Sequence, residues 1–341
     1  MNIYKLIFSL TLFMGTMISI SSYTWLGTWM GLEINLLSFI PLLKSKKNSY
    51  SSESSIKYFL VQALASTVFL FSVLTLMSTN SMISNVLNMN VFLMMIINSS
   101  LMLKMGAAPF HFWFPEIIEG MNWINSLILM TWQKIAPMMI LSYTIKFSNY
   151  IIFIILMSTL VGSLGGLNQT SIRKIMAYSS INHLGWMLSS FLNSEMLWIM
   201  YFSLYSFISI VLIYMLNSFK IFHLKQLYSF MNKNILIKFM LMLNLLSLGG
   251  LPPFLGFLPK WMIIQHLSDN YMYLLTFMIM MTLITLFFYL RIAYTSLILS
   301  HNELNFNILM NLNMKMNFST MILSFISING LILFTIFFNL Y

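Results

Sequence analysis

The stretch LMLKMGAAPFHFWFPEIIEG, residues 101–120, places a lysine inside an apolar run and then interrupts the run with Gly-Ala-Ala-Pro. Residues 89–105 alone would form a membrane helix that ends at Lys104. Because the residues after the proline are apolar as well, we expect a half-helix over about 110–119 to complete the crossing and to bring Lys104 toward the membrane centre. Irregular backbone is tolerated at that depth only where it is buried in protein or lines a water-filled cavity. The stretch therefore predicts a broken membrane helix beside a polar path.

The composition of the whole chain supports this interpretation. Hydrophobic residues make up 59% of the 341 positions and charged residues only 7%, which is far from the balance of a soluble domain. The chain has no cysteine, which excludes disulfides, thiolate-held iron–sulfur or zinc sites and a catalytic thiol. It also lacks nucleotide-binding glycine motifs and the H-E-x-x-H zinc motif. We predict an all-α polytopic membrane protein.

Eleven apolar windows are long enough to cross a hydrocarbon core of about 30 Å. No polar stretch between them exceeds about twenty residues, so we expect one transmembrane domain over 1–341 and no soluble domain. The windows are 3–20, 23–43, 56–77, 89–119 (interrupted), 123–145, 149–167, 170–190, 196–217, 235–267 (interrupted), 271–297 and 318–340.

Basic residues in the loops and toward the ends of the predicted spans are distributed very unevenly. Short basic loops stay on the side of the membrane that is not translocated. With eleven spans, thirteen basic residues fall on the side of the N-terminus, and only Lys146 falls on the other side. The thirteen are Lys5, Lys44, Lys46, Lys47, Lys57, Arg173, Lys174, Lys220, Lys225, Lys233, Lys238, Arg291 and Lys315. The loops thus account for the net charge of +10, so no nucleic-acid partner is expected.

Four charged residues are expected deep inside the predicted spans, away from the span ends. An ionisable side chain at the membrane centre costs about 2.5–3.5 kcal/mol on insertion scales, so a functional role is the default interpretation. The alternative is a structural ion pair between helices. The four are Glu33, Lys104, Lys134 and Lys260, and we add His111 and His183 as weaker candidates for a proton relay, because a neutral imidazole accepts a proton on one nitrogen and releases one from the other.

A second interrupted segment, GGLPPFLGFLPK from Gly249, resembles the opening stretch. An offset of 144 aligns Gly106 with Gly250 and Pro109 with Pro253. Interrupted helices at corresponding positions of two halves are typical of repeat-built transporters. Because the two segments are five spans apart, the repeats would be inverted. We predict a first five-helix repeat over 1–145, a second over 149–297, and an additional C-terminal helix over 318–340.

Five motifs together resemble the antiporter-like proton-channel family, which includes membrane subunits of respiratory NADH:ubiquinone oxidoreductase and cation/proton antiporters. The motifs are GLEINLLSFIPLL, LKMGAAPFHFWFPE, WQKIAP, AYSSINHLGW and GGLPPFLGFLPKW. The resemblance implies that protons move along a line of buried charges, with Glu33 as the glutamate and Lys104, Lys134 and Lys260 as the lysines.

The resemblance also implies a location and partners. The expected location is the mitochondrial inner membrane, with the N-terminus in the matrix and the C-terminus in the intermembrane space. The partners would be other membrane-arm subunits and lipids. No cofactor is expected in this chain, since NADH, flavin, iron–sulfur clusters and ubiquinone would be bound by other subunits. Two alternatives stay open, a free-standing cation/proton antiporter and a purely structural membrane subunit.

Overall fold

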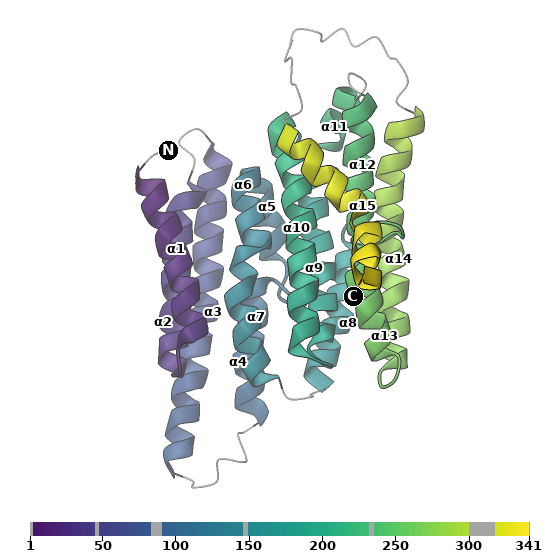
Figure 1. Ribbon diagram of the computed structural model, residues 1–341. Helices are drawn as coiled ribbons and strands as arrows, with labels where there is room; N and C mark the ends of the chain where they lie inside the picture. Colours follow the sequence, from purple (N-terminus) through teal and green to yellow (C-terminus); the bar gives the residue numbers. More distant parts are fainter. Residues whose placement is uncertain are drawn as a thin grey trace. The chain divides into compact units, whose positions relative to one another are not determined.

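The computed structural model describes residues 3–44, 48–82, 91–145, 149–231, 235–299 and 318–340. Within these ranges every regular element is a helix, apart from one isolated bridge between Ser171 and His223 (Figure 1). The chain divides into two compact units, Met1–Ile154 and Ile155–Tyr341, which are described separately below. The predicted all-α class is confirmed.

The first unit contains α1 to α7, and α8 crosses the boundary into the second. The bounds are α1 Ile3–Ser21, α2 Trp25–Leu43, α3 Ser49–Met82, α4 Val91–Met105, α5 Trp113–Gly120, α6 Trp123–Met130, α7 Trp132–Thr144 and α8 Asn149–Leu164. The second unit continues with α9 Ile172–Ser190, α10 Glu195–Phe219, α11 Leu224–Met231, α12 Ile235–Gly249, α13 Phe257–Leu267, α14 Met272–Tyr294, the π-helix η1 Thr295–Leu299 and α15 Phe318–Leu340.

Most of these helices fit a membrane by length and composition. Among the described residues, six helices are long and apolar enough to cross it: Ile3–Ser21, Trp25–Leu43, Ser49–Ser78, Trp123–Thr144, Glu195–Phe219 and Met272–Leu297. Shorter apolar helices follow at Val91–Met105, Asn149–Leu164, Ile237–Gly249 and Thr320–Ile332. The chain is therefore a multi-pass membrane protein.

Close helix pairs recur in the two units. In the first, a Cβ atom on Gly15 of α1 would lie 2.9 Å from the backbone nitrogen of Asn35 on α2. In the second, a Cβ atom on Gly162 of α8 would lie 2.5 Å from the backbone nitrogen of Asn182 on α9. Small residues let helices approach closely in membranes, where packing drives their association. The same pair of residue types, twenty positions apart, makes the same contact in both units.

Both predicted helix breaks are present, and they share one geometry. Gly106 and Gly250 have φ angles of +75° and +80°, which residues with a side chain rarely adopt. The amide of Gly106 donates to Leu103 and the next amide, of Ala107, donates to Met102. This is the Schellman arrangement that ends a helix at a left-handed glycine.

The second break repeats these bonds at the same offset of 144. Gly250 donates to Ser247 and Leu251 donates to Leu246. The flanking helices also correspond, since α4 and α12 begin and end 144 residues apart, as do the first residues of α5 and α13. The two segments, which align by their glycines and prolines, thus also match in their backbone hydrogen bonds and helix bounds.

A third break, which the sequence analysis did not predict, lies in the fifth span. The span 123–145 was expected to be continuous, but it divides at Thr131 into α6 and α7. Pro137 lies inside α7 and has no amide to bond the carbonyl four residues earlier, at Gln133. The adjacent bond from Lys134 to Thr131 spans only three residues. An irregular turn therefore lies directly before Lys134, ahead of the proline.

Contacts between helix ends place basic residues together in the second unit. The backbone of 170–172 bonds to that of 222–224, and Arg291 donates to the Leu167 carbonyl at 3.0 Å. The basic residues of these turns are Arg173, Lys174, Lys220 and Lys225.

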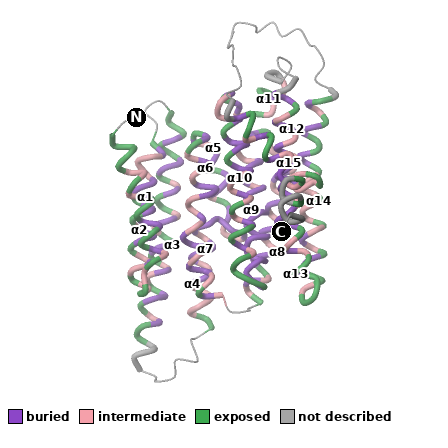
Figure 2. Tube along the Cα trace, in the orientation of Figure 1, coloured by how far each residue is buried: buried purple, intermediate pink, exposed green. Residues whose placement is uncertain are grey.

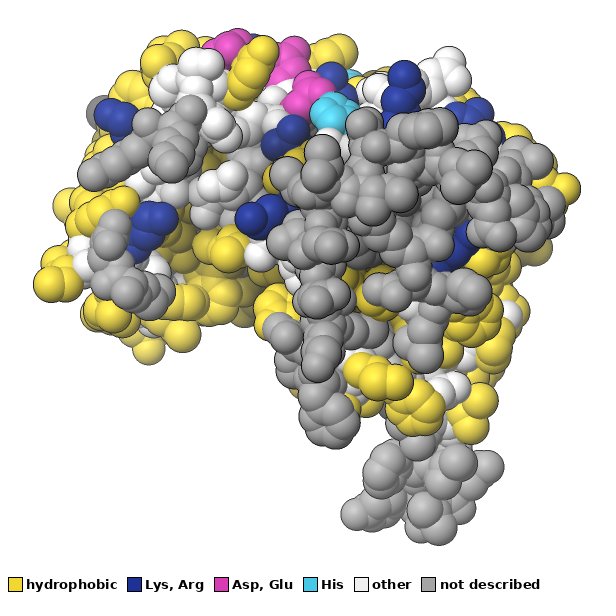
Figure 3. Space-filling view, turned by 90° about the horizontal axis from the view of Figure 1, so that it is seen from above, with side chains coloured by type: hydrophobic (Ala, Val, Ile, Leu, Met, Phe, Trp, Pro, Cys, Tyr) yellow, Lys and Arg dark blue, Asp and Glu magenta, His cyan; other side chains and the backbone are white. Residues whose placement is uncertain are grey.

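In the first unit, Asn125 donates to the carbonyl of Leu42, which brings the start of α6 to the end of α2 and so to Lys44. Lys57, in the third turn of α3, pairs with Glu116 on α5 at 3.0 Å. Dark blue Lys and Arg side chains are visible in the end-on view of Figure 3. Lys46, Lys47, Lys146, Lys233 and Lys315 lie outside the described residues.

Candidate functional site

Three of the predicted charged residues lie in the first unit, each on a different helix. Lys104 is near the end of α4 and Lys134 is in the first turn of α7, and their side chains are 7% and 1% exposed. Glu33, in the middle of α2, is partly exposed, but its Oε2 atom is buried. Glu33 is close enough to Lys104 to interact with it electrostatically, although among the described residues Oε2 of Glu33 and Nζ of Lys104 have no hydrogen-bond partner. Burying a charge without a partner costs free energy, so helix packing alone does not account for these two residues.

Aromatic rings partly replace water around the two ammonium groups. Nζ of Lys104 lies 5.9 Å from the centre of the Phe69 ring, and Nζ of Lys134 lies 5.5 Å from that of Phe114. A cation over a ring face is attracted by about 0.5–2 kcal/mol. Because this is less than the cost of burying the charge, the rings alone do not account for the lysines.

A small polar cavity connects the two lysines. Its lining includes Lys104, Lys134, Tyr58 and Gln133, and its volume is about 10 Å³. This is near the lower limit for one water molecule, and a buried water needs two to four polar partners. Four of the lining residues carry polar side chains, so the lining meets this requirement for a single water.

A chain of neutral polar side chains surrounds this cavity. Gln133 donates to Asn35 on α2 at 3.0 Å, and the Tyr58 hydroxyl lies 3.5 Å from the Gln133 amide oxygen. Gln62 donates to the carbonyl of Lys104 at 3.1 Å, which is one of the acceptors left open where α4 ends. A side chain of α3 thus donates a hydrogen bond to one of the carbonyls left open where α4 ends.

Lys260 lies in the second unit, in the first turn of α13, and is 6% exposed. Its ammonium group donates to the carbonyl of Gly249, the last residue of α12, at 2.9 Å. A Cβ atom on Gly250 would lie 3.0 Å from Nζ, so the glycine leaves room for the lysine. At the second break, a main-chain carbonyl of the break itself therefore binds the lysine ammonium group.

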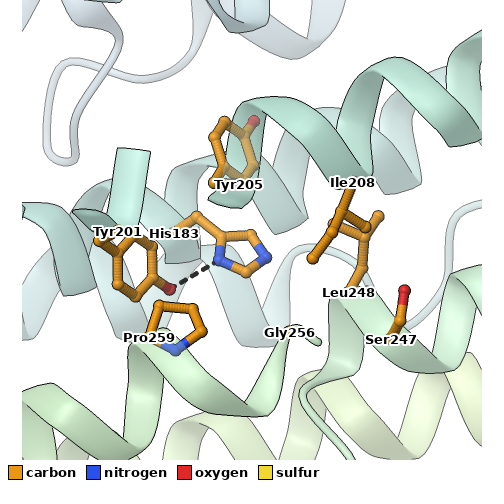
Figure 4. A pocket seen from close by; sticks show the side chains of 8 residues that line it. All are labelled: His183, Tyr201, Tyr205, Ile208, Ser247, Leu248, Gly256 and Pro259. Atoms are coloured by element: carbon orange, nitrogen blue, oxygen red, sulfur yellow. Dashed lines mark hydrogen bonds between the residues drawn. The ribbon is translucent and has the colours of Figure 1, made fainter. Parts of the chain in front are cut away.

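The two histidines differ in their surroundings. His111 lies in the turn between α4 and α5, where Nδ1 is 3.3 Å from the carbonyl of Pro109, and among the described residues it has no other hydrogen-bond partner. This local contact is what a structural histidine would make. His183 is on α9, a helix whose residues are almost all buried (Figure 2), and its Nδ1 lies 2.8 Å from the Tyr201 hydroxyl (Figure 4).

The charged residues of the site are evident from the sequence, whereas their neutral neighbours were not predicted. The structure brings Glu33, Lys104 and Lys134 together in the first unit, and it places Lys260 and His183 in the second. The missed residues are Asn35, Tyr58, Gln62, Gln133, Tyr201 and Tyr205. Gln133 could have been found from its place next to Lys134, and Asn35 from its place two residues after Glu33, whereas the others lie further from the charges in the sequence.

Among the described residues, no three His, Cys, Asp or Glu side chains lie close enough to hold a metal ion. The fold and the site define a polytopic membrane protein that buries ionisable side chains beside broken helices, the arrangement of proton and ion pathways.

Comparison with known sequences identifies the family. The chain belongs to the NADH:quinone oxidoreductase/Mrp antiporter transmembrane family, whose model matches residues 22–287. NADH-ubiquinone oxidoreductase chain 2 of Anopheles gambiae is 54% identical over 329 residues, which is 96% of this chain and 96% of that protein. The protein of the same name from Locusta migratoria is 52% identical over 332 residues, covering 97% of this chain and 96% of that protein.

The fold is also that of a solved structure. A chain of respiratory complex I from Thermus thermophilus with bound aureothin superimposes with a TM-score of 0.78 over 88% of this chain and 72% of that chain. The two sequences are 22% identical. At this sequence identity, the comparison shows only that the two chains share a fold.

Proposed function

We propose that the chain is a proton-translocating membrane-arm subunit of NADH:ubiquinone oxidoreductase, which couples redox energy to proton pumping. The observation that carries this proposal is the pair of buried lysines in the first unit, joined by a polar cavity and flanked by Glu33. The chain would contribute to the enzyme as a subunit and perform no redox chemistry itself. Its two curated relatives named above carry the name of that oxidoreductase and match over 96% of their length.

The proposed pathway consists of Glu33, Lys104, Lys134 and Lys260, with His183 as a relay. His111 is a weaker candidate, because its contact with the Pro109 carbonyl is local. A carboxylate beside an ammonium group stabilises both charges, so a change in this distance alters how firmly the lysine holds its proton. An arginine would keep its proton throughout, whereas a lysine can release it. Lys104 is the proposed switch, because it combines a buried ammonium group with an adjacent helix break.

We infer eleven crossings arranged as two inverted five-helix repeats, 1–145 and 149–297, followed by the helix at 318–340. The shared hydrogen bonds at Gly106 and Gly250 support this inference, since 250 − 106 = 144 and the neighbouring helices keep the same offset. The contacts of Gly15 with Asn35 and of Gly162 with Asn182 support it independently, at an offset of 147.

The proposed location is the mitochondrial inner membrane, with the N-terminus in the matrix and the C-terminus in the intermembrane space. Basic residues at one end of each unit support this orientation, because such loops resist translocation. Other membrane-arm subunits and lipids are the proposed partners, and nucleic acid is not among them. NADH, flavin, iron–sulfur clusters and ubiquinone are assigned to other subunits, and the lack of cysteine in this chain fits that assignment.

The experiment that tests the proposal is Lys104→Met in the assembled complex. Methionine keeps the apolar volume of the stem and removes the proton. We expect NADH oxidation and assembly to survive and the number of protons pumped per NADH to fall. Lys57→Met is the matched control, because Lys57 is a half-exposed lysine that pairs with Glu53 and Glu116. Unchanged pumping in an assembled Lys104→Met complex would favour the purely structural alternative.

The second alternative, a free-standing cation/proton antiporter, is tested by purification. The family model includes Mrp antiporters, so this alternative has a specific basis. A chain that purifies alone and exchanges cations for protons in vesicles would establish it. Purification within a large respiratory complex would support the proposed function.

A further inference from the structure

A small cavity in the second unit lies between α9, α10 and the second helix break. His183, Tyr201 and Tyr205 line one side of it, and Ser247, Gly256 and Pro259 line the other (Figure 4). Its volume is about 10 Å³, near the lower limit for a single water molecule. Pro259 directly precedes Lys260, so the cavity adjoins the turn that carries this lysine.

The direction of the hydrogen bond between His183 and Tyr201 follows from where the hydrogen of the Tyr201 hydroxyl can be accepted. Tyr201 is 1% exposed, and among the described residues its hydroxyl bonds only to Nδ1 of His183, at 2.8 Å. A buried hydroxyl hydrogen without an acceptor is unfavourable. The Tyr201 hydroxyl therefore donates its hydrogen, and Nδ1 of His183 accepts it. A neutral imidazole carries one hydrogen, so that hydrogen must be on Nε2.

The second ring nitrogen points away from Tyr201. Figure 4 shows it on the side of the ring that faces Leu248 and Ser247. The Ser247 hydroxyl donates to the carbonyl of Asn244 at 2.7 Å, which leaves its oxygen able to accept a hydrogen bond. The Nε2–H group of His183 therefore faces the cavity, while its Nδ1 accepts the hydrogen bond from Tyr201.

We propose that Tyr201 is a positioning residue that holds His183 in the Nε2-protonated form, with Nε2–H directed into the cavity beside the second helix break. His183 gains a second proton only at Nδ1, because Nε2 is already protonated. When a proton adds there, the Tyr201 hydrogen must turn away so that the Tyr201 oxygen accepts from Nδ1–H. Rotation of one hydroxyl thus controls when His183 becomes charged. This inference rests on the proposed function.

Tyr205 offers a matched control inside the same cavity. Its ring lies 4.9 Å from that of His183, but its hydroxyl is hydrogen-bonded with Ser180. Tyr205→Phe keeps the ring contact and removes the buried hydroxyl that is hydrogen-bonded with Ser180. Tyr201→Phe removes the hydroxyl that is hydrogen-bonded with His183.

The test is a double-mutant cycle on proton pumping by the assembled complex in vesicles. We expect Tyr201→Phe to slow proton transfer through His183 by about tenfold, the effect of one lost hydrogen bond to a buried ring. Combined with His183→Gln, Tyr201→Phe should add no further loss, because Tyr201 acts through His183. The effects of Tyr205→Phe and His183→Gln should instead be additive. If the Tyr201 and His183 effects add as well, Tyr201 is only a packing residue and the inference is wrong.

Two further measurements keep the test decisive. If Tyr201→Phe does not assemble, Tyr201→Gln supplies an N–H donor in place of the hydroxyl, and pumping above the level of His183→Gln would support the inference. Pumping no better than His183→Gln would overturn it. If His183→Gln alone leaves pumping unchanged while Lys104→Met abolishes it, the role of the His183–Tyr201 pair is refuted and the proposed function stands. If Lys104→Met also has no effect, the proposed function fails too.

Discussion

The depth of Lys104 in the membrane can be measured apart from any pumping assay. Lys104 is thirteen residues after the start of α4 at Val91, which corresponds to about 20 Å along a helix axis. If α4 starts at the membrane surface, Lys104 lies about 5 Å beyond the centre of a hydrocarbon core of about 30 Å. The insertion penalty there is somewhat below the central value of about 2.5–3.5 kcal/mol. Lys104→Met should therefore improve insertion of this segment by about 2 kcal/mol, or roughly thirtyfold.

The assay places residues 89–120 in a host membrane protein with glycosylation sites on both sides and measures the inserted fraction. Lys134→Met in residues 123–144 should give a slightly larger gain, because Lys134 is central in that span. Lys57→Met in residues 49–78 is the control and should change little, because Lys57 stands at the start of its apolar run and is 43% exposed. A gain below about 0.5 kcal/mol for Lys104→Met would mean that its ammonium group reaches the surface by snorkelling. The argument for a buried charge would then be refuted.

Two other predictions concern packing and orientation. Gly31→Ala should lower the temperature at which the solubilised complex loses this chain, by an amount equivalent to about 1–3 kcal/mol, because the new Cβ would lie 2.5 Å from the backbone nitrogen of Ser19. Gly249→Ala, whose Cβ would have its nearest neighbour at 3.5 Å, should be nearly neutral, and equal losses for the two would contradict the packing argument. Because the chain has no cysteine, a single Lys225→Cys should react with an impermeant thiol reagent only from the matrix side, and Asn193→Cys only from the intermembrane side. The reverse pattern would overturn the orientation, and reaction of both cysteines from the same side would overturn the span count.

Local signals in the sequence were sufficient to locate the two main breaks. Glycine supplies the positive φ that a Schellman ending needs, and proline prevents the helix from continuing, so both events are encoded within a few residues. The break at Thr131 was missed because no glycine or proline marks it, the nearest proline being Pro137, six residues further on. Its effect on Lys134 depends on backbone geometry that no short pattern specifies.

The hydrogen-bond pairings among the neutral side chains of the site could not be predicted from the sequence. Gln133 bonds to Asn35 across 98 residues, and Gln62 bonds to Lys104 across 42. Such pairings depend on which helices pack together. Isolated polar residues in apolar spans are also more numerous than those that take part in the site, since many serines simply bond to the carbonyl three residues earlier.

The main-chain carbonyls at the two breaks have a consequence for how such a protein can change over generations. In one copy the cation is Lys104, before the break, and in the other it is Lys260, after it. The second break offers its cation the carbonyl of Gly249, an acceptor that point mutations leave in place as long as the helix ends there. The first break makes no such contact, because Nζ of Lys104 has no hydrogen-bond partner among the described residues. The backbone of a break can thus persist while its charge moves from one arm to the other and changes its partners.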